Sequence, residues 1–467
     1  MASQTAPSAE DVGQDPGRPS AITFVVCCAA FVAMLDVFVV NVAFTDIGSE
    51  FDAGLADLSW VLNAYAIVYA ALLIPAGRLA DRYGRKPAFL AGLALFTAAS
   101  AACASAPQLW WLVSFRVLQA VGAAVLTPAG LGLLLTVLPA ARRSGAVRIW
   151  ATTSSFAAAV GPVVGGGLVE LSWRWVFLIN IPVGVAAFVA ARRVLPDLRD
   201  TSAVRMPDPL GTAALVVAFG ALSLGLVKGQ EWGWTEAATL GAFAGAAAGI
   251  AVFVVRISSH PAPVVDPALL RTPAFVWANI TVLMFCTAFG AVFPSVVLWL
   301  QGPAGYSTLA TGLAIAPGPL MVPLFAVVGR RLATHVPAGA LVAAGNLLFA
   351  GGALLLAAGA SPDTRYATQI LPGWLVIGVG IGLAMPVMLS QATARLPGAQ
   401  AATGSAVVNT SRQLGYVLGV AILVAVLGTV DPLHDPAQTF RHAWWFIAVT
   451  AAGSAATALG ITGRARS

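Results

Sequence analysis

Two charged residues, Asp36 and Arg116, are the leading candidates for chemistry because each interrupts a long apolar stretch. Asp36 lies in AITFVVCCAAFVAMLDVFVVNVAF, where residues 21–44 hold no other charge. A lone charge in hydrocarbon costs on the order of 3 kcal/mol, so such a residue is usually paired or functional. Burial of this kind favours the neutral form of a carboxyl group. Asp36 is therefore a candidate proton carrier.

Arg116 lies at a similar predicted depth if its helix crosses the membrane in the opposite direction to that of Asp36. It falls roughly 10 Å below one membrane edge, and Asp36 roughly 12 Å below the same edge, at about 1.5 Å per helical residue. We expect the two charges to interact directly, through water or through Gln119. Protonation of Asp36 would then release Arg116 and provide a charge switch. A permanent structural ion pair is the alternative.

The composition identifies the elements that position these residues as membrane helices. Hydrophobic residues make up 59% of the 467 residues and charged residues 9%, against roughly 25% charged in soluble domains. Apolar runs of about 20 residues, each long enough to cross a bilayer as a helix, recur along the chain. The alternation of a membrane barrel is absent, so helices satisfy the backbone. The sequence predicts an all-α integral membrane protein with fourteen spans, near residues 21–44, 57–77, 87–105, 109–137, 146–169, 174–191, 209–227, 238–256, 273–300, 308–329, 338–358, 367–393, 402–428 and 440–461.

The basic residues predict the orientation of these helices. With both termini in the cytoplasm, nineteen of the 25 Lys and Arg fall in cytoplasmic loops or tails and four fall in outer loops. This asymmetry follows the positive-inside rule. The net charge of +6 then reflects membrane topology, and a nucleic-acid partner is not expected.

Internal similarity predicts two six-helix halves. An offset of 258 residues places RVLQAVGAAVLTP (116–128) on WLVIGVGIGLAMP (374–386), and Gly161 on Gly419. Such repeats are common in carriers, although Gly-rich helices also match by chance. The predicted organisation is a tail (1–20), a six-helix bundle (21–195), an inserted helix pair with linkers (196–272), a second six-helix bundle (273–462) and a short tail (463–467).

Several motifs resemble those of the major facilitator superfamily. GRLADRYGRKP (77–87) resembles its loop signature. The motifs that are similar to its fourteen-helix drug:proton antiporter branch are LDVFVVNVAF (35–44), FRVLQAVGAA (115–124), AVGPVVGGG (159–167), SWRWVFLINIPVG (172–184), DPLG (208–211) and NTSRQLGYVLGVA (409–421). The resemblance covers about residues 20–461. It implies the major facilitator fold, a 6 + 2 + 6 helix arrangement, a monomer and export driven by protons.

The resemblance also implies gating roles for two motifs. The loop cluster would close the cytoplasmic face when the carrier opens outward; a solvated basic loop that only sets topology is the alternative. Its members are Gly77, Asp81, Arg82, Gly84, Arg85 and Lys86. The small residues of the fifth span would let it bend and lie between the two halves, unless they serve helix packing alone. These are Gly161, Pro162, Gly165 and Gly166.

Polar and aromatic residues within the spans are candidates for a substrate cavity. Arg412 lies near the predicted midplane without an acidic partner, so it either binds backbone carbonyls or faces the cavity and attracts an anionic group. The candidate cavity residues are Phe38, Asn41, Tyr65, Gln119, Asn409, Arg412 and Gln413. Of the remaining polar residues in the spans, Asn63, Asn180 and Asn279, we expect most to be interhelical hydrogen-bond partners.

The expected function is export of small amphiphilic compounds, such as drugs or antibiotics, across a bacterial cytoplasmic membrane in exchange for protons. The residues include no nucleophile beside a His, no Cys/His set with metal spacing and no GxxxxGK[ST] motif, so neither an enzyme nor a cofactor other than the coupling proton is expected. The bilayer and the transported small molecule are the expected partners. A proton-coupled importer or uniporter of a nutrient, and a translocator of lipid or envelope precursors, remain alternatives.

Overall fold

The computed structural model describes residues 18–138, 140–196, 208–261, 263–361, 365–394, 396, 398–428 and 435–462. Within these residues the chain forms helices and no strand. The predicted C-terminal tail, most of the N-terminal tail and residues 197–207 of the linker before the inserted pair lie outside them. Thirteen helices among the described residues are long and apolar enough to span a membrane. The apolar part of α7 is the shorter stretch Phe156–Val169, so the count of fourteen stays a prediction.

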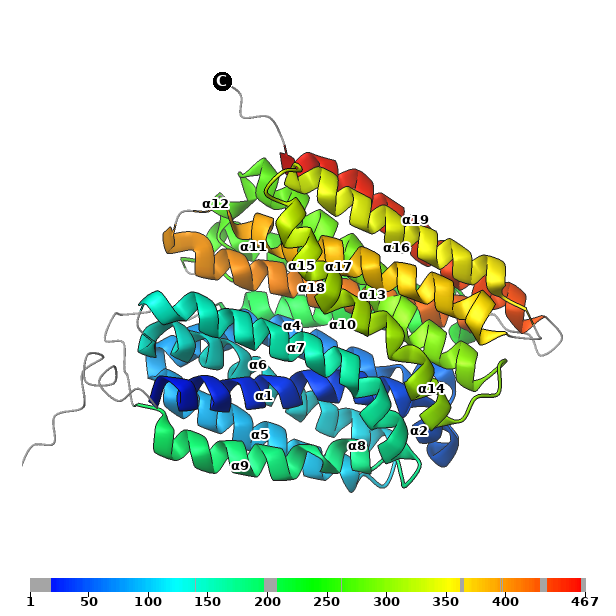
Figure 1. Cartoon of the computed structure of the whole chain (residues 1–467), viewed down its shortest axis with the longest axis horizontal. Helices are drawn as coiled ribbons and strands as arrows, with labels where there is room; N and C mark the ends of the chain where they lie inside the picture. Colours follow the sequence, from blue (N-terminus) through cyan, green and yellow to red (C-terminus); the bar gives the residue numbers. More distant parts are fainter. Residues whose placement is uncertain are drawn as a thin grey trace, which may run out of the picture.

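The first group of helices lies in the lower half of Figure 1. Its long members are α1 (Arg18–Val42), α4 (Trp60–Tyr83), α5 (Arg85–Ala104), α6 (Leu109–Val137), α7 (Ala140–Val169) and α9 (Asn180–Val194). The short helices α2 (Phe44–Phe51), α3 (Leu55–Leu58) and α8 (Trp175–Leu178) lie at the end opposite the N-terminus, called the far side below. The end where α1 begins is called the termini side.

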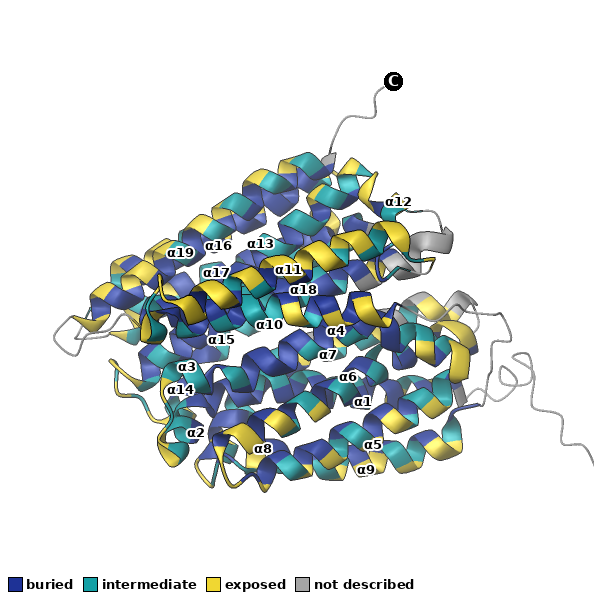
Figure 2. Ribbon diagram, turned by 180° about the vertical axis from the view of Figure 1, so that it is seen from behind, coloured by how far each residue is buried: buried dark blue, intermediate teal, exposed yellow. Residues whose placement is uncertain are grey.

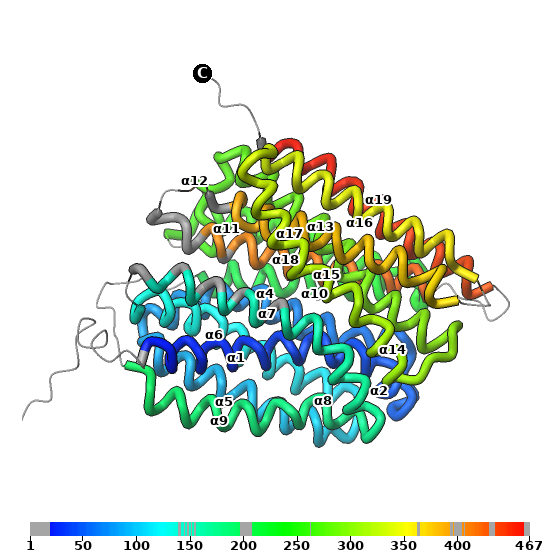
Figure 3. Tube along the Cα trace, viewed as in Figure 1, coloured from blue at the N-terminus to red at the C-terminus, as the bar shows by residue number. Residues whose placement is uncertain are grey.

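Most of the second group lies in the upper half of the molecule, and α14 extends down beside α2, as the trace in Figure 3 shows. This group comprises α13 (Pro273–Gln301), α14 (Thr308–Ile315), α15 (Pro317–Leu332), α16 (Ala338–Gly359), α17 (Leu371–Ala394), α18 (Gly398–Leu427) and α19 (Pro436–Ala458), with the π-helical turn η2 (Tyr366–Ile370) and the 3-10 turn η3 (Leu459–Thr462). The predicted span 308–329 is therefore broken between α14 and α15, just before Pro317. A proline ring cannot donate a backbone hydrogen bond, which favours a break there.

Close glycine contacts hold equivalent helix pairs together in both groups. A Cβ on Gly122 of α6 would lie 2.6 Å from the Phe96 backbone N of α5, so only glycine allows this approach. In the second group a Cβ on Gly380 of α17 would lie 2.5 Å from the Gly345 carbonyl O of α16. Gly122 and Gly380 are matched by the repeat offset. Between lipid-exposed helices, small residues of this kind permit close backbone packing.

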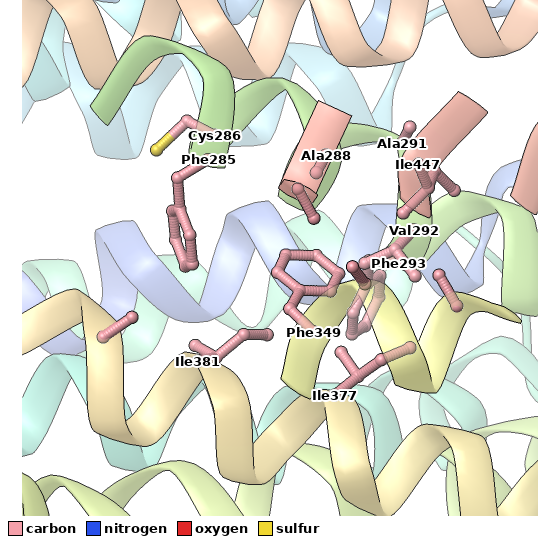
Figure 4. Packing of buried hydrophobic residues seen from close by; sticks show 14 of the residues in the cluster. Phe285, Cys286, Ala288, Ala291, Val292, Phe293, Phe349, Ile377, Ile381 and Ile447 are labelled. Atoms are coloured by element: carbon pink, nitrogen blue, oxygen red, sulfur yellow. The ribbon is translucent and has the colours of Figure 1, made fainter. Parts of the chain in front are cut away.

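The core of the second group is aromatic and aliphatic (Figure 4). Phe285 of α13 meets Phe349 of α16 edge to face, with ring centroids 5.7 Å apart. Ile377 and Ile381 of α17 belong to the same buried cluster. This edge-to-face arrangement is typical of aromatic pairs in tightly packed interiors. It stabilises the core against which α18 packs.

The inserted pair, α10 (Pro209–Trp232) and α11 (Ala237–Ser259), lies on the face shown in Figure 2. The α10 helix packs against both α4 and α18, one from each group. Lys228 forms an ion pair with Asp57 at 2.7 Å, and the Gln230 side chain donates to the Ala425 carbonyl at 3.4 Å. The pair thus bridges the two groups along one side.

Three helices, α10, α12 (Pro267–Leu270) and α19, start with the same local pattern, an Asp followed by Pro. Asp208, Asp266 and Asp435 each accept a hydrogen bond from the backbone N–H two residues later. An Asp cap followed by a proline favours helix initiation because both suit the unpaired first turn. Asp208 also accepts from the Arg256 guanidinium of α11 at 2.8 Å. The hydrogen bonds from Arg256 lower the pKa of Asp208 to about 2.

We expect Asp208→Asn to lower the Tm of the purified protein by a few degrees at pH 7. The ordinary Asp pKa is about 3.9, and the folded value is about 2. The stabilisation is therefore present above about pH 4 and is lost as the pH falls toward the folded value. Thermal unfolding at pH 7 and pH 3 should show the difference shrinking at the lower pH. The matched control is Asp435→Asn, which alters the same kind of cap without an ion pair in the described structure. Equal losses for the two variants would contradict this account.

Candidate functional site

Asp36 lies in the last third of α1, where it contacts side chains of α6 and α9. Its side chain is 0% exposed, and that of Arg116 on α6 is 1% exposed. The Arg116 guanidinium donates directly to Asp36 Oδ2, so the predicted direct contact is present in the structure. Asp36 Oδ1 accepts from Gln119 Nε2 at 2.9 Å and from Asn180 Nδ2 at 2.8 Å. Both carboxylate oxygens therefore accept hydrogen bonds from neighbouring helices.

Arg116 is held by contacts other than Asp36 as well. Its Nη1 donates to Gln119 Oε1 at 2.6 Å, and its Nε donates to the Val61 carbonyl of α4 at 3.1 Å. The guanidinium carbon lies 4.2 Å from the centroid of the Tyr65 ring. A cation over an aromatic face is stabilised by the ring quadrupole. Arg116 therefore retains partners if the charge on Asp36 is removed.

The sequence analysis missed Ser100 of α5 and did not assign Asn180 of α9 to this site. Ser100 Oγ accepts from Gln119 Nε2 at 2.8 Å and from Asn180 Nδ2 at 3.3 Å. Asn180 begins α9 after the break that follows α8, and its Oδ1 has no partner in the described structure. An unpaired buried acceptor is uncommon. Asn180 lies within the motif SWRWVFLINIPVG (172–184) and Ser100 lies in none of the motifs, but only the rotation of α5 and α9 brings either side chain to Asp36.

The loop cluster folds back on the first group of helices. Arg85 Nε donates to Asp81 Oδ1 at 2.8 Å, and Arg85 Nη1 donates to the Gly132 carbonyl of α6 at 2.7 Å. Lys86 Nζ donates to the Leu195 carbonyl beyond α9 at 2.6 Å. The cluster thus ties the end of α4 to α6 and α9. Its closing role stays a prediction.

Other members of the cluster have structural contacts. A Cβ on Gly77 would lie 3.4 Å from Pro128 of α6, an ordinary van der Waals distance. Gly84 has φ 107°, which favours glycine at the turn between α4 and α5. The Arg82 guanidinium lies 5.6 Å from the centroid of the Tyr83 ring. These contacts explain local geometry and indicate no further ligand.

The glycines of α7 contact helices of both groups. A Cβ on Gly161 would lie 2.7 Å from Phe38 Cβ, and one on Gly165 would lie 3.2 Å from Val39 Cα, both on α1. On the second group, a Cβ on Gly166 would lie 2.8 Å from the Thr308 carbonyl O. Pro162 lies inside α7, and a Cβ on Gly312 of α14 would lie 2.3 Å from the Pro162 carbonyl O. The predicted motif therefore occupies the boundary between the groups.

On the far side, polar contacts join the two groups. The Thr45 hydroxyl donates to Gln301 Oε1, and Gln301 Nε2 donates to the Val42 carbonyl at 3.1 Å. The Thr308 hydroxyl donates to Asp46 Oδ2 at 3.1 Å. Burial raises the pKa of Asp46 above its ordinary range, and this hydrogen bond opposes the rise. These contacts join α1 and α2 to α13 and α14 on the far side.

The cavity candidates separate into three sets, of which the α18 residues are given last. Tyr65 and Gln119 are buried around Arg116 and do not meet solvent. Phe38 contacts Phe293 of α13 edge to face at 5.5 Å, and the Tyr416 hydroxyl of α18 lies 3.3 Å from Asn41 Nδ2, so these residues join the two groups. The third set, which keeps partial exposure on α18, is Asn409, Arg412 and Gln413.

The remaining intramembrane amides differ from the expectation in one case. The Ser411 hydroxyl donates to Asn279 Oδ1 at 2.9 Å, as expected for an interhelical partner. Asn63 of α4 is buried, and neither side-chain polar atom has a partner in the described structure. Among the described residues, no group of three or more His, Cys, Asp or Glu could hold a metal ion.

The family model for the Major Facilitator Superfamily matches residues 26–420. The "Cephamycin export protein CmcT" of Amycolatopsis lactamdurans is 34% identical, with 93% of this chain and 90% of the relative covered. The "Methylenomycin A resistance protein" of Streptomyces coelicolor is 32% identical, with coverage of 90% and 89%. The "Multidrug resistance protein Stp" of Mycobacterium tuberculosis is 31% identical, with coverage of 93% and 82%.

Solved structures agree on the fold. The peptide transporter POT in complex with sulfate matches with a TM-score of 0.70 and 19% identity, covering 98% of each chain. This likeness supports the fold alone. With the family match and the named relatives, it confirms the family and the major facilitator fold predicted from the motifs. The chain belongs to the major facilitator superfamily and is a multi-pass membrane transporter related to antibiotic-resistance and multidrug-efflux proteins, not an enzyme.

Proposed function

We propose that the protein exports small amphiphilic compounds across a bacterial cytoplasmic membrane in exchange for protons, with Asp36 as the proton site. The observation that carries the proposal is the buried carboxylate of Asp36 joined to Arg116. A charge so costly to bury is retained in membrane spans mainly for transport or proton relay. The names of the relatives, which refer to resistance and export, support the direction of transport.

The coupling step follows from the hydrogen bonds. Ionised Asp36 accepts from Arg116, Gln119 and Asn180. A proton on Asp36 removes its charge and one acceptor position, which weakens the bond to Arg116. Arg116 keeps the Val61 carbonyl, Gln119 and the Tyr65 ring as partners. Helix α1 is then free to move relative to α6.

Movement of α1 would be transmitted directly to the boundary between the two groups of helices. The Phe38 side chain, two residues after Asp36, lies against Gly161 of α7, and α7 in turn lies against α14. We propose that protonation loosens this stack, so that the far side opens and the termini side closes. The basic loops assign the termini side to the cytoplasm. The loop cluster around Arg85 and the glycines of α7 would provide the gating contacts.

We expect inverted vesicles containing the protein to accumulate a fluorescent amphiphile when respiration makes their interior acidic. An exporter moves its substrate out of the cytoplasm and therefore into an inverted vesicle. A protonophore should collapse the accumulation to the level of vesicles without the protein. Fluorescence quenching during energisation measures both the accumulation of the amphiphile and its collapse by the protonophore.

Different outcomes would favour the other transport classes. Protonophore-sensitive loss of preloaded substrate from inverted vesicles would support an importer, and transport that ignores the proton gradient would support a uniporter. A deletion strain that mislocalises an envelope lipid while its drug sensitivity stays unchanged would support a lipid translocator. Each of these results would contradict the proposed export.

A further inference from the structure

Arg412 of α18 differs from Arg116 in having no hydrogen-bond or ion-pair partner among the described residues. Its side chain is half-buried, and it forms no hydrogen bond or ion pair with the residues that the structure describes. The alternative from the sequence, a bond to backbone carbonyls, is thus not found in the described structure. A partly exposed guanidinium without a counter-ion among the described residues is available to bind an anionic group from outside the protein.

Arg412 belongs to a polar stripe along one face of α18. The stripe comprises Asn409, Arg412, Gln413 and Tyr416, whose spacing of three or four residues places them on the same face. Tyr416 contacts Asn41 of α1, so the stripe is directed toward the first group of helices. Asn409 is partly exposed one turn nearer the termini side. A compound arriving from the cytoplasm would therefore meet Asn409 before Arg412.

The surroundings of Arg412 come from both groups. Ser411, next to Arg412, donates to Asn279 Oδ1 of α13 at 2.9 Å. The neighbouring Thr410 donates to the Ala70 carbonyl of α4 at 3.3 Å, which fixes the contact between α18 and α4. Arg412 is thus held at the boundary that alternating access must rearrange.

Asp36 of α1 is already bonded within its own site and is not paired with Arg412. Both oxygens of Asp36 accept hydrogen bonds from Arg116, Gln119 and Asn180, and its side chain is 0% exposed. The Asp36–Arg116 pair carries no net charge when ionised, so Arg412 leaves this region with one excess positive charge. An anionic ligand group would balance it.

We propose that the polar stripe of α18 is a substrate-binding subsite in which Arg412 binds the carboxylate of amphiphilic organic acids. The planar guanidinium matches a carboxylate in two parallel hydrogen bonds. The Gln413 amide, which has no partner in the described structure, supplies a further donor beside it. This inference rests on the proposed export function and assigns weakly acidic compounds as its preferred substrates.

The test is binding of pyrenebutyrate and its uncharged methyl ester to the purified full-length protein in lipid nanodiscs. The wild type should bind the acid more tightly than the ester. Arg412→Gln should weaken binding of the acid about tenfold or more, because a hydrogen-bonded charge pair is lost. Binding of the ester should stay within about twofold, and Arg412→Lys should recover part of the preference for the acid.

Arg365→Gln is the matched control, since it removes an exposed arginine charge away from the bundle boundary. It should leave both affinities unchanged. Equal affinity of the wild type for acid and ester, or equal weakening of both by Arg412→Gln, would overturn the subsite. Uptake of the ester into inverted vesicles tests the export function independently of binding of the acid. Protonophore-sensitive ester uptake by Arg412→Gln, together with lost acid binding, supports both proposals.

Discussion

Asp36→Asn is expected to reduce substrate-induced proton release to background while the protein stays folded. Asparagine has nearly the shape of aspartate but carries no titratable proton at neutral pH. Its amide oxygen can still accept from Gln119 or Asn180, which hold the wild-type carboxylate at 2.9 and 2.8 Å. The measurement is the pH change of a weakly buffered solution of purified protein when substrate is added.

Two controls distinguish a proton switch from a permanent ion pair. Glu236→Gln neutralises an exposed carboxyl group at the start of α11 and should release protons as the wild type does. If the Asp36–Arg116 pair were only structural, Asp36→Asn would destabilise the fold, by up to about 3–5 kcal/mol for loss of a buried pair, and would leave proton release intact. A large fall in Tm, with proton release preserved in the folded fraction, would therefore reject the switch.

Gly166→Val is expected to reduce transport at least tenfold without preventing insertion or folding. Its Cβ would lie 2.8 Å from the Thr308 carbonyl O and 3.0 Å from Leu309 Cα, so α7 and α14 would have to separate. Overpacking of this kind costs about 1–3 kcal/mol, and each 1.4 kcal/mol changes a population about tenfold. The variant should favour conformations that are open on the far side.

The adjacent residue provides the control. A Cβ on Gly167 meets nothing within 4 Å, so Gly167→Val should transport normally. A cysteine placed at Thr45, whose hydroxyl contacts Gln301 in the closed form, reports opening through its reaction with a membrane-impermeant maleimide. Labelling should be faster in Gly166→Val than in Gly167→Val. Equal labelling and transport in the two variants would show that α7 packing does not gate the pathway.

Much of the site could be predicted because membrane helices impose strong local rules. A lone carboxylate in an apolar run stands out in the sequence, and the rise per helical residue places Asp36 and Arg116 at the same depth. The observed contact between them agrees with that estimate. The motif around Pro162 likewise predicted a close contact between the halves, because small residues let backbones approach.

The remaining features depend on how the helices are rotated and which helix lies beside which. Ser100 and Asn180 join Asp36 only because α5 and α9 present these faces to α1. Depth and composition do not distinguish Gly166, which meets α14, from Gly167, which meets nothing within 4 Å. In the sequence, Arg116 and Arg412 are both charges within apolar helices. Packing pairs Arg116 with Asp36, whereas Arg412 has no partner among the described residues.

The amino-acid sequence was sufficient for the membrane helices, the family and the principal charge pair. Hydrophobic length, loop charge and short motifs are properties of neighbouring residues, and water and lipid act on them directly. The partners of Asp36, the contact of Gly166 with α14 and the position of Arg412 between the groups required the assembled bundle. A side-chain contact between helices depends on their mutual rotation, which arises from the packing of the whole chain.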